Sequence, residues 1–206
     1  MVYLVRHGVH EKDPATEAAD GNEDGALTDV GRAQARLLGE RLRGIPFAGI
    51  HHSTLRRGRE TAEVLAEYLP GVALTPSDLL RECIPMRPPD DLLTEQQREF
   101  FDGWPREILD HGSRQAVAAV DRYAGVPDGG APPELLVSHG NLIGWFVCEA
   151  LDVPRPRWLS LPLHYNCALT IIVYRAGRPP SLMSYNDMGH LPAELRGTDY
   201  PDEFRV

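Results

Sequence analysis

The chain has 206 residues, with 21 lysine and arginine side chains against 30 aspartate and glutamate side chains, which gives a formal net charge of −9. A net acidic surface repels polyanions, so we expect neither nucleic acid nor an anionic membrane as a partner. Hydrophobic residues make up 42% of the chain, but no uncharged apolar run approaches the roughly 20 residues of a membrane helix, so we expect a soluble protein with one full core.

The first part of the chain alternates between strand and helix patterns. Residues 3–5 are apolar and strand-sized, and the polar sequence Arg-His-Gly follows them. The acidic, small residues at 10–26 indicate a surface loop, and residues 28–45 have the apolar spacing of a helix with threonine as its N-cap. Residues 47–52 predict a second strand, and residues 53–69 predict a helix capped by its first serine or threonine.

The later part of the chain repeats this alternation. Residues 113–124 predict a helix, and residues 135–137 predict a buried strand that ends at Ser-His-Gly. The next helix, at 141–151, would be capped by its asparagine; it is apolar nearly all round and must therefore lie in the interior. Residues 168–174 are rich in β-branched side chains and predict a further strand. The tail from residue 179 is turn-rich and loosely patterned.

Strands that alternate with helices predict a three-layer α/β/α sandwich with a mainly parallel central sheet. The whole chain, residues 1–206, is expected to form one domain. Residues 76–112 contain several prolines among many charged residues, which indicates irregular structure with one or two short helices. This segment is the expected cap or lid insertion.

Two of the predicted strands end in a histidine that is followed by a glycine, at His7 and at His139. Ligands of parallel α/β sheets bind beyond the carboxyl ends of the strands, so both histidines are expected to open onto one crevice. A neutral imidazole is a competent nucleophile toward phosphorus. The charge on a phosphoryl group in transfer requires cations and N–H donors around it, and Arg6 and Arg57 would supply the cations.

Five motifs follow one another in order from the first strand to beyond the middle of the chain. They are Leu4-Val5-Arg6-His7-Gly8, Leu27-Thr28-x-x-Gly31-x-x-Gln34-Ala35, Ser53-x-Leu55-x-Arg57-x-x-x-Thr61-Ala62, Leu80-x-Glu82 and Val137-Ser138-His139-Gly140. This ordered set resembles the motifs of the histidine phosphatase superfamily, which has the phosphoglycerate mutase-like fold.

The resemblance implies a role for each matched residue. It implies that His7 is the nucleophile that becomes phosphohistidine, and that Arg6, Arg57 and His139 form the phosphate pocket. It implies that Glu82 protonates the leaving oxygen and later helps to activate water, which requires burial or a nearby anion to raise the pKa of this carboxyl group. It implies no metal ion or other cofactor. The neighbouring residues expected to line the substrate pocket are Gly8, Gly140 and Asn141.

A closer similarity covers the second half of the chain. Its motifs are Asp78-Leu79-Leu80-Arg81-Glu82 followed by Pro85, His139-x-Asn141-x-Ile143, Phe146-Val147-Cys148-x-Ala150-Leu151, Trp158-Leu159 and Asn186-Asp187-x-Gly189-His190-Leu191-Pro192. These resemble the mitochondrial branch of the superfamily that dephosphorylates serine and threonine residues of proteins, although we see no N-terminal membrane anchor. The resemblance implies a phosphomonoesterase whose substrate is a phosphorylated small molecule or a phosphoprotein.

Two other functions stay open at this point. A phosphoglycerate mutase would use the same histidine, but the usual Arg-His-Gly-Glu-Ser and Glu-Arg-His-Tyr-Gly sequences are absent. The usual asparagine after the nucleophile is also missing, because residues 12–14 are Lys-Asp-Pro, and His10 or Arg87 would have to supply its contact. This altered loop motivates the second alternative, a phosphate-binding scaffold protein with weak turnover.

Several other residues have ordinary structural interpretations. The pairs His7-x-x-His10 and His51-His52 could be metal ligands, but no third ligand follows at a familiar spacing, so we expect no metal centre. His164, Asn166 and His190 are candidates for the crevice, although a structural role is the more common one for such residues.

The cysteines and the N-terminus bear on the compartment. Cys83, Cys148 and Cys167 form no CxxC pair and are expected to be buried or partly buried thiols, which suits a reducing compartment. The N-terminus carries no basic segment followed by a long apolar stretch, so no secretory signal is predicted and we expect a cytoplasmic location. The apolar tail and the region of Trp158 suggest a homodimer.

Overall fold

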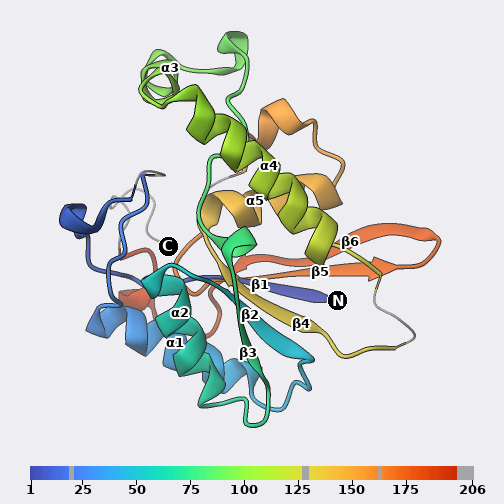
Figure 1. Cartoon of the computed structure of the whole chain (residues 1–206). Coiled ribbons are helices and arrows are strands. Elements are labelled where there is room, and N and C mark those ends of the chain that lie inside the picture. Colours follow the sequence, from blue (N-terminus) through green and yellow to red (C-terminus); the bar gives the residue numbers. More distant parts are fainter. Residues whose placement is uncertain (19–20, 127–129, 162–163, 199–206) are drawn as a thin grey trace.

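A six-stranded mixed sheet runs through the middle of the molecule in the order β3-β2-β4-β1-β5-β6 (Figure 1). The computed structural model describes residues 1–18, 21–126, 130–161 and 164–198. Its strands are β1 (Val2–Arg6), β2 (Gly49–Ser53), β3 (Leu74–Ser77), β4 (Glu134–Ser138), β5 (Leu169–Arg175) and β6 (Arg178–Asp187). Strands β3, β2, β4 and β1 are parallel neighbours, and β5 is antiparallel to both β1 and β6, so the prediction of a mainly parallel sheet is confirmed.

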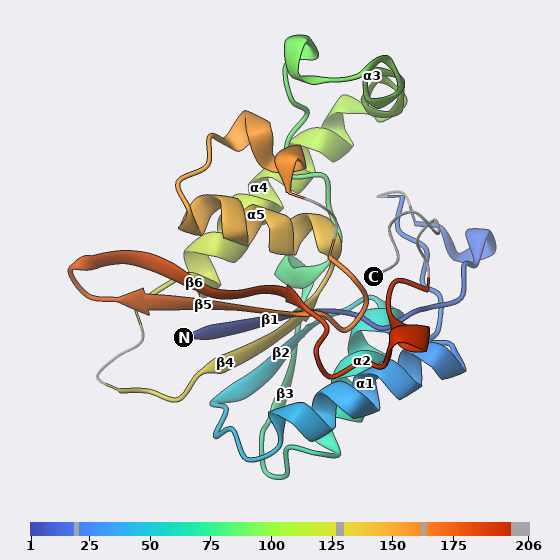
Figure 2. The same ribbon diagram turned by 180° about the vertical axis from the view of Figure 1, so that it is seen from behind.

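Helices cover both faces of this sheet, as Figures 1 and 2 show. Helices α1 (Asp29–Leu42) and α2 (Arg56–Ala66) lie on one face, and α4 (Arg106–Tyr123) and α5 (Gly140–Ala150) lie on the other. The three-layer α/β/α prediction is therefore confirmed. Short 3-10 helices occur at Pro14–Thr16, Asp78–Leu80, Asp90–Leu92, Arg155–Ser160 and Ala193–Leu195.

The two layers of helices enclose two apolar cores. Successive side chains of a strand point to opposite faces, so Leu4 of β1 joins the core under α4 and α5, whereas Val5 joins the core under α1 and α2. Helix α5 is buried nearly all round, with Trp145 and Phe146 each 1% exposed, which confirms that this helix is interior. Strand β1 is therefore packed on both faces, and this packing holds the start of the segment that follows it, at His7.

Several predicted elements differ from the observed ones. Helix α4 begins at residue 106 rather than 113, because the helix runs through Gly112 instead of starting after it. Strand β6 occupies residues 178–187, which were expected to be loosely structured, and β3 lies at 74–77. The N-cap positions of α2 and α5 are Leu55 and His139, and neither makes a side-chain capping bond. The threonine cap of α1 is confirmed, since the hydroxyl oxygen of Thr28 accepts from the Gly31 N–H.

The segment between β3 and α4 extends away from the sheet and carries α3 (Glu95–Asp102), as Figure 1 shows. The indole N–H of Trp158 donates to the Met86 carbonyl oxygen at 2.9 Å, which ties this segment to the 3-10 helix after α5. The Arg87 guanidinium pairs with Asp90 and Asp102 at 2.6 and 2.8 Å. That a segment at about 76–112 acts as a cap stays a prediction.

Candidate active site

The carboxyl ends of β1, β2 and β4 meet at one edge of the sheet. Arg6 pairs with Ser138, and β2 runs in parallel register along the other side of β4. His7 and His139 follow the ends of their strands directly, and their ring centroids lie 4.9 Å apart. Two histidines that lie far apart in the sequence are therefore neighbours in space.

The hydrogen bonds of His7 decide which ring nitrogen carries the proton. Its Nδ1 lies 2.8 Å from the Gly8 carbonyl oxygen, which can only accept, so Nδ1 must be the protonated donor. Its Nε2 accepts from Nε–H of Arg57 at 3.3 Å and therefore holds the free lone pair. The site presents a neutral imidazole with its unprotonated nitrogen turned toward a guanidinium.

The surroundings of His7 keep it neutral. The side chain is 3% exposed, and burial is the largest cause that lowers its pKa well below 6.5. The neighbouring His139, Arg6, Arg57 and His10 lower the pKa further, since a second positive charge is unfavourable beside them. The same causes, burial first and then Arg57, lower the pKa of His139 well below 6.5. An anion that binds here would meet two guanidinium groups and two uncharged imidazoles.

We expect the protein to lose stability in acid because of these two histidines. An unfolded histidine titrates near 6.5, whereas the folded pKa of His7 and of His139 lies well below, so below that pH the unfolded chain binds protons that the folded chain does not. Each such histidine lowers the free energy of unfolding by up to about 1.4 kcal/mol for each pH unit. Denaturant titrations between pH 7 and pH 5 measure this slope.

The variant His139→Gln provides the control for this prediction. The slope of its unfolding free energy against pH should be shallower than that of the unmodified protein by the contribution of one histidine. Glu82, whose pKa is raised, contributes a slope of opposite sign to both proteins, so the difference between them removes it. Identical slopes in the two proteins would contradict the prediction.

The backbone around His7 is held by side chains from distant elements. The His7 carbonyl oxygen accepts from the Asn166 side chain at 3.0 Å, and the Gly8 N–H donates to the Thr61 hydroxyl at 3.1 Å. The Val9 N–H donates to the Gln34 side-chain oxygen at 3.0 Å. Thr61 and Gln34 both belong to the sequence motifs, and their observed role is to fix the turn after His7.

We expect Gly8→Ala to destabilise the protein and displace this turn. A Cβ atom on Gly8 would lie 2.6 Å from the Gly31 carbonyl oxygen, a backbone atom that cannot move aside without shifting α1. The free energy of unfolding should fall by about 1–3 kcal/mol, the usual cost of overpacking. The matched variant is Gly144→Ala in α5, where nothing lies within 4 Å of the added atom, so it should be neutral or stabilising. Equal melting temperatures for the two variants would contradict this prediction.

Glu82 lies on an irregular segment whose carbonyl groups are held one after another by side chains. The Leu80 carbonyl accepts from the Ser138 hydroxyl at 2.9 Å, and the Arg81 carbonyl accepts from Gln115 at 2.8 Å. The Glu82 carbonyl accepts from the Asn22 amide at 3.0 Å, and the Cys83 carbonyl accepts from the Asn141 amide at 3.3 Å. Because these donors come from β4, α4, the first loop and α5, the position of Glu82 is fixed without regular secondary structure.

The surroundings of Glu82 act on its pKa in opposite directions. Burial is the largest cause acting on it and raises its pKa above 4.5, while Arg57 opposes that shift. Its two oxygens accept from backbone N–H groups, from Cys83 at 3.1 Å and more weakly from Asn141 at 3.5 Å. A bound phosphate dianion would raise the pKa further, because a second negative charge disfavours the carboxylate.

The sequence motifs missed Asn22, which the structure brings into the site. Its side chain is 7% exposed, accepts from the Arg57 guanidinium at 3.2 Å and donates to the Glu82 carbonyl. Of the substitutes expected for the missing asparagine, Arg87 instead pairs with acidic residues, while the His10 ring packs edge-on against His7 with centroids 5.0 Å apart. An asparagine inside an acidic loop gives no periodic signal, so only the folded loop reveals its position.

His139 is oriented by the end of β2. Its Nε2 lies 2.8 Å from the Ser53 hydroxyl, which also accepts from the Leu55 N–H. Ser53 therefore orients a histidine of the site instead of capping α2. Among the described residues, the buried Nδ1 of His139 has no hydrogen-bond partner, so it is available to a bound oxygen.

Four further histidines, His51, His52, His164 and His190, lie outside the group around His7. His51 and His52 are consecutive strand residues and point to opposite faces, so they cannot chelate one ion together. The His164 carbonyl oxygen accepts from the Arg6 guanidinium at 2.6 Å, and His190 contacts the Cys167 carbonyl oxygen at 3.1 Å. His164 thus supports the arginine of the site. Within the described ranges no group of three His, Cys, Asp or Glu side chains is arranged to hold a metal ion.

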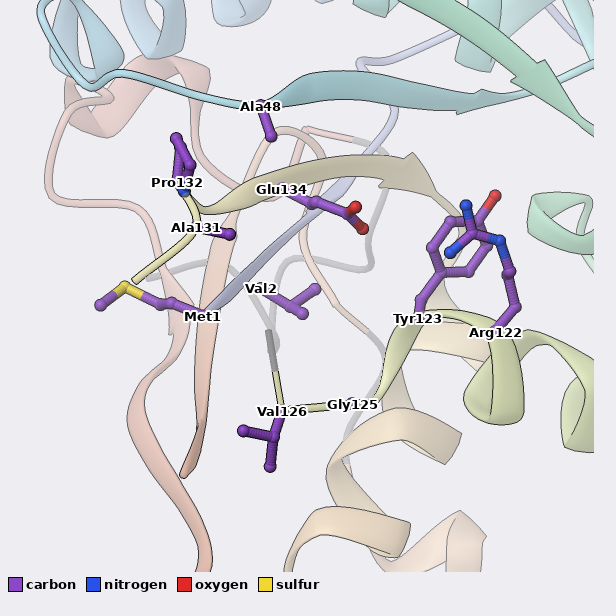
Figure 3. A pocket seen from close by; sticks show the side chains of 10 residues that line it. All are labelled: Met1, Val2, Ala48, Arg122, Tyr123, Gly125, Val126, Ala131, Pro132 and Glu134. Carbon is purple, nitrogen blue, oxygen red and sulfur yellow. The ribbon is translucent and has the colours of Figure 1, made fainter. Parts of the chain in front are cut away.

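Another cavity, of about 320 Å³, lies at the opposite end of the sheet (Figure 3). It is lined by residues near the starts of β1 and β4, Met1, Val2 and Glu134 among them, and by Arg122 and Tyr123 at the end of α4. The catalytic candidates all follow the carboxyl ends of the strands, so this cavity is separate from them.

Comparison with known proteins identifies the relatives of the chain. The family model described as the histidine phosphatase superfamily (branch 1) matches residues 2–188. The chain is 33% identical over 196 residues to "Serine/threonine-protein phosphatase PGAM5, mitochondrial" from Xenopus laevis, which covers 94% of this chain and 67% of that protein. It therefore spans about two thirds of that relative's length.

Two further similarities support the same grouping. The chain is 33% identical to "Probable phosphoglycerate mutase GpmB" from Photorhabdus laumondii, with 85% of each chain covered. Among solved structures, YhfR from Bacillus stearothermophilus superimposes with a TM-score of 0.68 at 25% identity, over 92% of this chain and 98% of that one.

The expected cytoplasmic location is wrong in the light of these relatives, because the PGAM5 phosphatases that the chain resembles are named as mitochondrial. A missing secretory signal and unpaired cysteines separate secreted from intracellular proteins, but they do not separate cytosol from mitochondrion. No helix in the described part of the chain is both long and apolar enough to cross a membrane. The expected homodimer stays a prediction.

Proposed function

This chain belongs to the histidine phosphatase superfamily (branch 1), and we propose that it hydrolyses phosphate monoesters in two steps through a phosphohistidine on His7. The observation that carries the proposal is the protonation state of His7, whose Nε2 is unprotonated and faces the Arg57 guanidinium. A nucleophile in that state, beside a cation that attracts phosphate, has what in-line attack on phosphorus requires.

In the first step the lone pair of His7 Nε2 attacks the phosphorus atom, and the bond from phosphorus to the ester oxygen breaks. The departing oxygen takes the proton of the Glu82 carboxyl group, which becomes a carboxylate. Arg6, Arg57 and His139 stabilise the charge on the equatorial oxygens. The buried Nδ1 of His139, which has no partner among the described residues, supports its assignment as a donor to one of these oxygens.

In the second step a water molecule attacks the phosphorus atom and gives its proton to the Glu82 carboxylate. The bond from phosphorus to Nε2 breaks, inorganic phosphate leaves, and His7 returns to its neutral form. The same carboxyl group acts as acid and then as base, which favours a pKa not far from the working pH. Burial raises the pKa of Glu82 in that direction.

The substrate class includes phosphorylated small molecules and phosphoproteins. The PGAM5 relatives are named as serine/threonine-protein phosphatases, and this supports a phosphoprotein as one candidate substrate. A mutase activity is the second candidate, because a probable phosphoglycerate mutase is among the relatives. The scaffold alternative was motivated by the altered stretch at residues 9–14. Asn22, later in the same loop, contacts Arg57 and the Glu82 carbonyl oxygen, which weakens that alternative.

Trapping the covalent intermediate tests the proposal. The protein is mixed with a radiolabelled phosphomonoester and quenched with detergent at alkaline pH, because the phosphorus–nitrogen bond is labile in acid. We expect label on His7 and free phosphate as the product from a panel of sugar phosphates, phosphoglycerates, nucleotides and phosphopeptides. Isomerised phosphoglycerate would favour the mutase, and no label with no phosphate released from any ester would overturn the proposal.

A further inference from the structure

A cavity of about 130 Å³ opens beside the Glu82 carboxylate. One end is polar, where Asn22, Glu82 and Asn141 meet. The other end is formed by large apolar side chains of the segment between β3 and α4 and of α4 itself, which are Ile84, Phe100, Trp104 and Ile108. A leaving group whose oxygen takes the Glu82 proton would extend into this cavity, because the same carboxyl group lines it.

Two glycines fix the walls of this cavity. A Cβ atom on Gly21 would lie 2.0 Å from the Trp104 ring, so the first loop packs directly on that indole. A Cβ atom on Gly112 would lie 2.4 Å from the Ile84 carbonyl oxygen, so α4 packs against the segment that carries Glu82. These contacts leave the aromatic wall little freedom to move, and the cavity is therefore shaped before a substrate arrives.

The lining carries no arginine or lysine, and its polar members besides Glu82 include Asn22, His111, Gln115 and Asn141. Two arginines of the neighbouring segment pair with acidic residues instead, Arg87 with Asp90 and Asp102, and Arg106 at 3.7 Å from Asp110. A leaving group with its own carboxylate or phosphate would lose hydration in this cavity and meet no arginine or lysine in its lining, which is unfavourable. The lining therefore disfavours the glycerate end of a phosphoglycerate relative to an uncharged group.

Apolar space continues past the cavity. A second hollow of about 460 Å³ shares Ile84, Phe100 and Asn141 with it and is otherwise mostly apolar, with Trp158 among its lining residues. Phe100 borders both spaces and is 54% exposed, so its ring is accessible to a bound group. Its ring and the Trp104 ring lie 6.2 Å apart in a nearly edge-on arrangement.

We infer that the preferred substrates of this site carry an uncharged apolar leaving group, such as a ring, which packs against Trp104 and Phe100. This inference rests on the proposed function, because the cavity becomes a leaving-group pocket only if Glu82 faces the leaving oxygen. The two rings, in a lining without arginine or lysine, favour such a group over one that carries a second negative charge.

A comparison of three alkyl phosphates tests the inference. Benzyl phosphate, glycerol 1-phosphate and 3-phosphoglycerate all release primary alcohols of high pKa, so the reactivity of the leaving group separates them little. We expect kcat/KM for benzyl phosphate to exceed that for glycerol 1-phosphate by about 10- to 100-fold, which is the range for burying one aromatic ring. Phosphoglycerate should be the poorest of the three.

Variants of the pocket separate its role from general stability. Phe100→Ala and Trp104→Leu should lower kcat/KM for benzyl phosphate about 3- to 10-fold and leave glycerol 1-phosphate nearly unchanged. The control is Glu99→Ala, an exposed position of α3 outside the lining, which should change neither. Equal losses for all substrates, or phosphoglycerate as the best substrate, would overturn the inference while the phosphatase function stands.

A binding measurement keeps the inference testable if turnover fails. Benzylphosphonate cannot be hydrolysed, and calorimetry should give it a Kd at least about 10-fold lower than that of methylphosphonate, with the difference lost in Trp104→Leu. Equal Kd values for the two phosphonates would overturn the inference. The proposed function fails separately, when no ester is hydrolysed and no phosphohistidine forms.

Discussion

The His7→Asn variant should lose at least about 10⁴-fold in kcat/KM toward every phosphomonoester, because it lacks the nitrogen proposed to form the covalent intermediate. The amide nitrogen of asparagine, like Nδ1 of His7, is bonded to Cγ and can still donate to the Gly8 carbonyl oxygen, so the turn after β1 should keep its shape. The measurement is a steady-state assay with p-nitrophenyl phosphate together with the alkaline-quench labelling. No label should remain on the variant.

The structure offers a matched control for this variant in the same sheet. His52 is also buried at the carboxyl end of a strand, and its Nδ1 contacts the carbonyl oxygen of the next residue at 2.9 Å, just as that of His7 does at 2.8 Å. His52→Asn should therefore show a similar change in unfolding free energy, about 1 kcal/mol, while activity stays within about threefold. If both variants lose activity together, the loss reports folding, and His7 has no special chemical role.

The Glu82→Gln variant should show a loss that depends on the leaving group. With alkyl phosphates kcat/KM should fall about 10³-fold, within the range for general acid catalysis, because an alkoxide departs poorly without a proton. With p-nitrophenyl phosphate the loss should be at most about tenfold, since nitrophenolate departs unaided. The measurement is kcat/KM of both proteins for a set of esters with different leaving-group pKa values. The plot of log kcat/KM against this pKa should be steeper for Glu82→Gln. Equal losses across the set would contradict the role of Glu82.

The pH profile gives an independent test of the same residue. Glu82 donates its proton only below its own pKa, which burial raises, so kcat/KM for alkyl phosphates should fall as pH rises through that pKa. On the acid side, His7 attacks only when neutral, and its lowered pKa keeps it neutral until pH is well below 6.5. Glu82→Gln should lose the alkaline limb and keep the acid limb. If Glu82→Gln keeps the alkaline limb of the kcat/KM profile, another group is responsible for that limb.

The sequence predicts the layers and the strand ends because these depend on short-range patterns. Residues 3–5 and 135–137 are apolar runs that stop at a histidine, and parallel pairing alone brings their ends together. Strand β6 was not predicted, because Pro179 and Pro180 suggest turns. It lies at the edge of the sheet, where a strand tolerates prolines that a central strand would not. Helix α4 was predicted too short because residues 76–112, with prolines among many charges, indicate irregular structure. Gly112 instead lies within the helix, where it allows close contact with Ile84.

The missed part of the site depends on contacts between distant segments. Asn22 belongs to a loop without periodicity, and its role arises only where it meets Arg57 and Glu82. The aromatic wall formed by Phe100 and Trp104 is likewise invisible in the sequence, since two aromatic residues in an irregular segment resemble ordinary core residues. Local patterns thus predict which residues could react, while long-range packing decides what surrounds them.

The pairing of β1 also has a consequence for how the protein matures. The two strands that pair with β1 are β4 and β5, which begin at Glu134 and Leu169. The His7 N–H donates to the Ser138 carbonyl oxygen, and the His7 carbonyl oxygen accepts from the Asn166 side chain. Closing such long loops costs entropy, and topologies built on distant pairings fold slowly. During synthesis the segment of His7 is therefore not held in place until β5 has emerged from the ribosome, so we expect a nascent or truncated chain that ends before β5 to lack phosphatase activity.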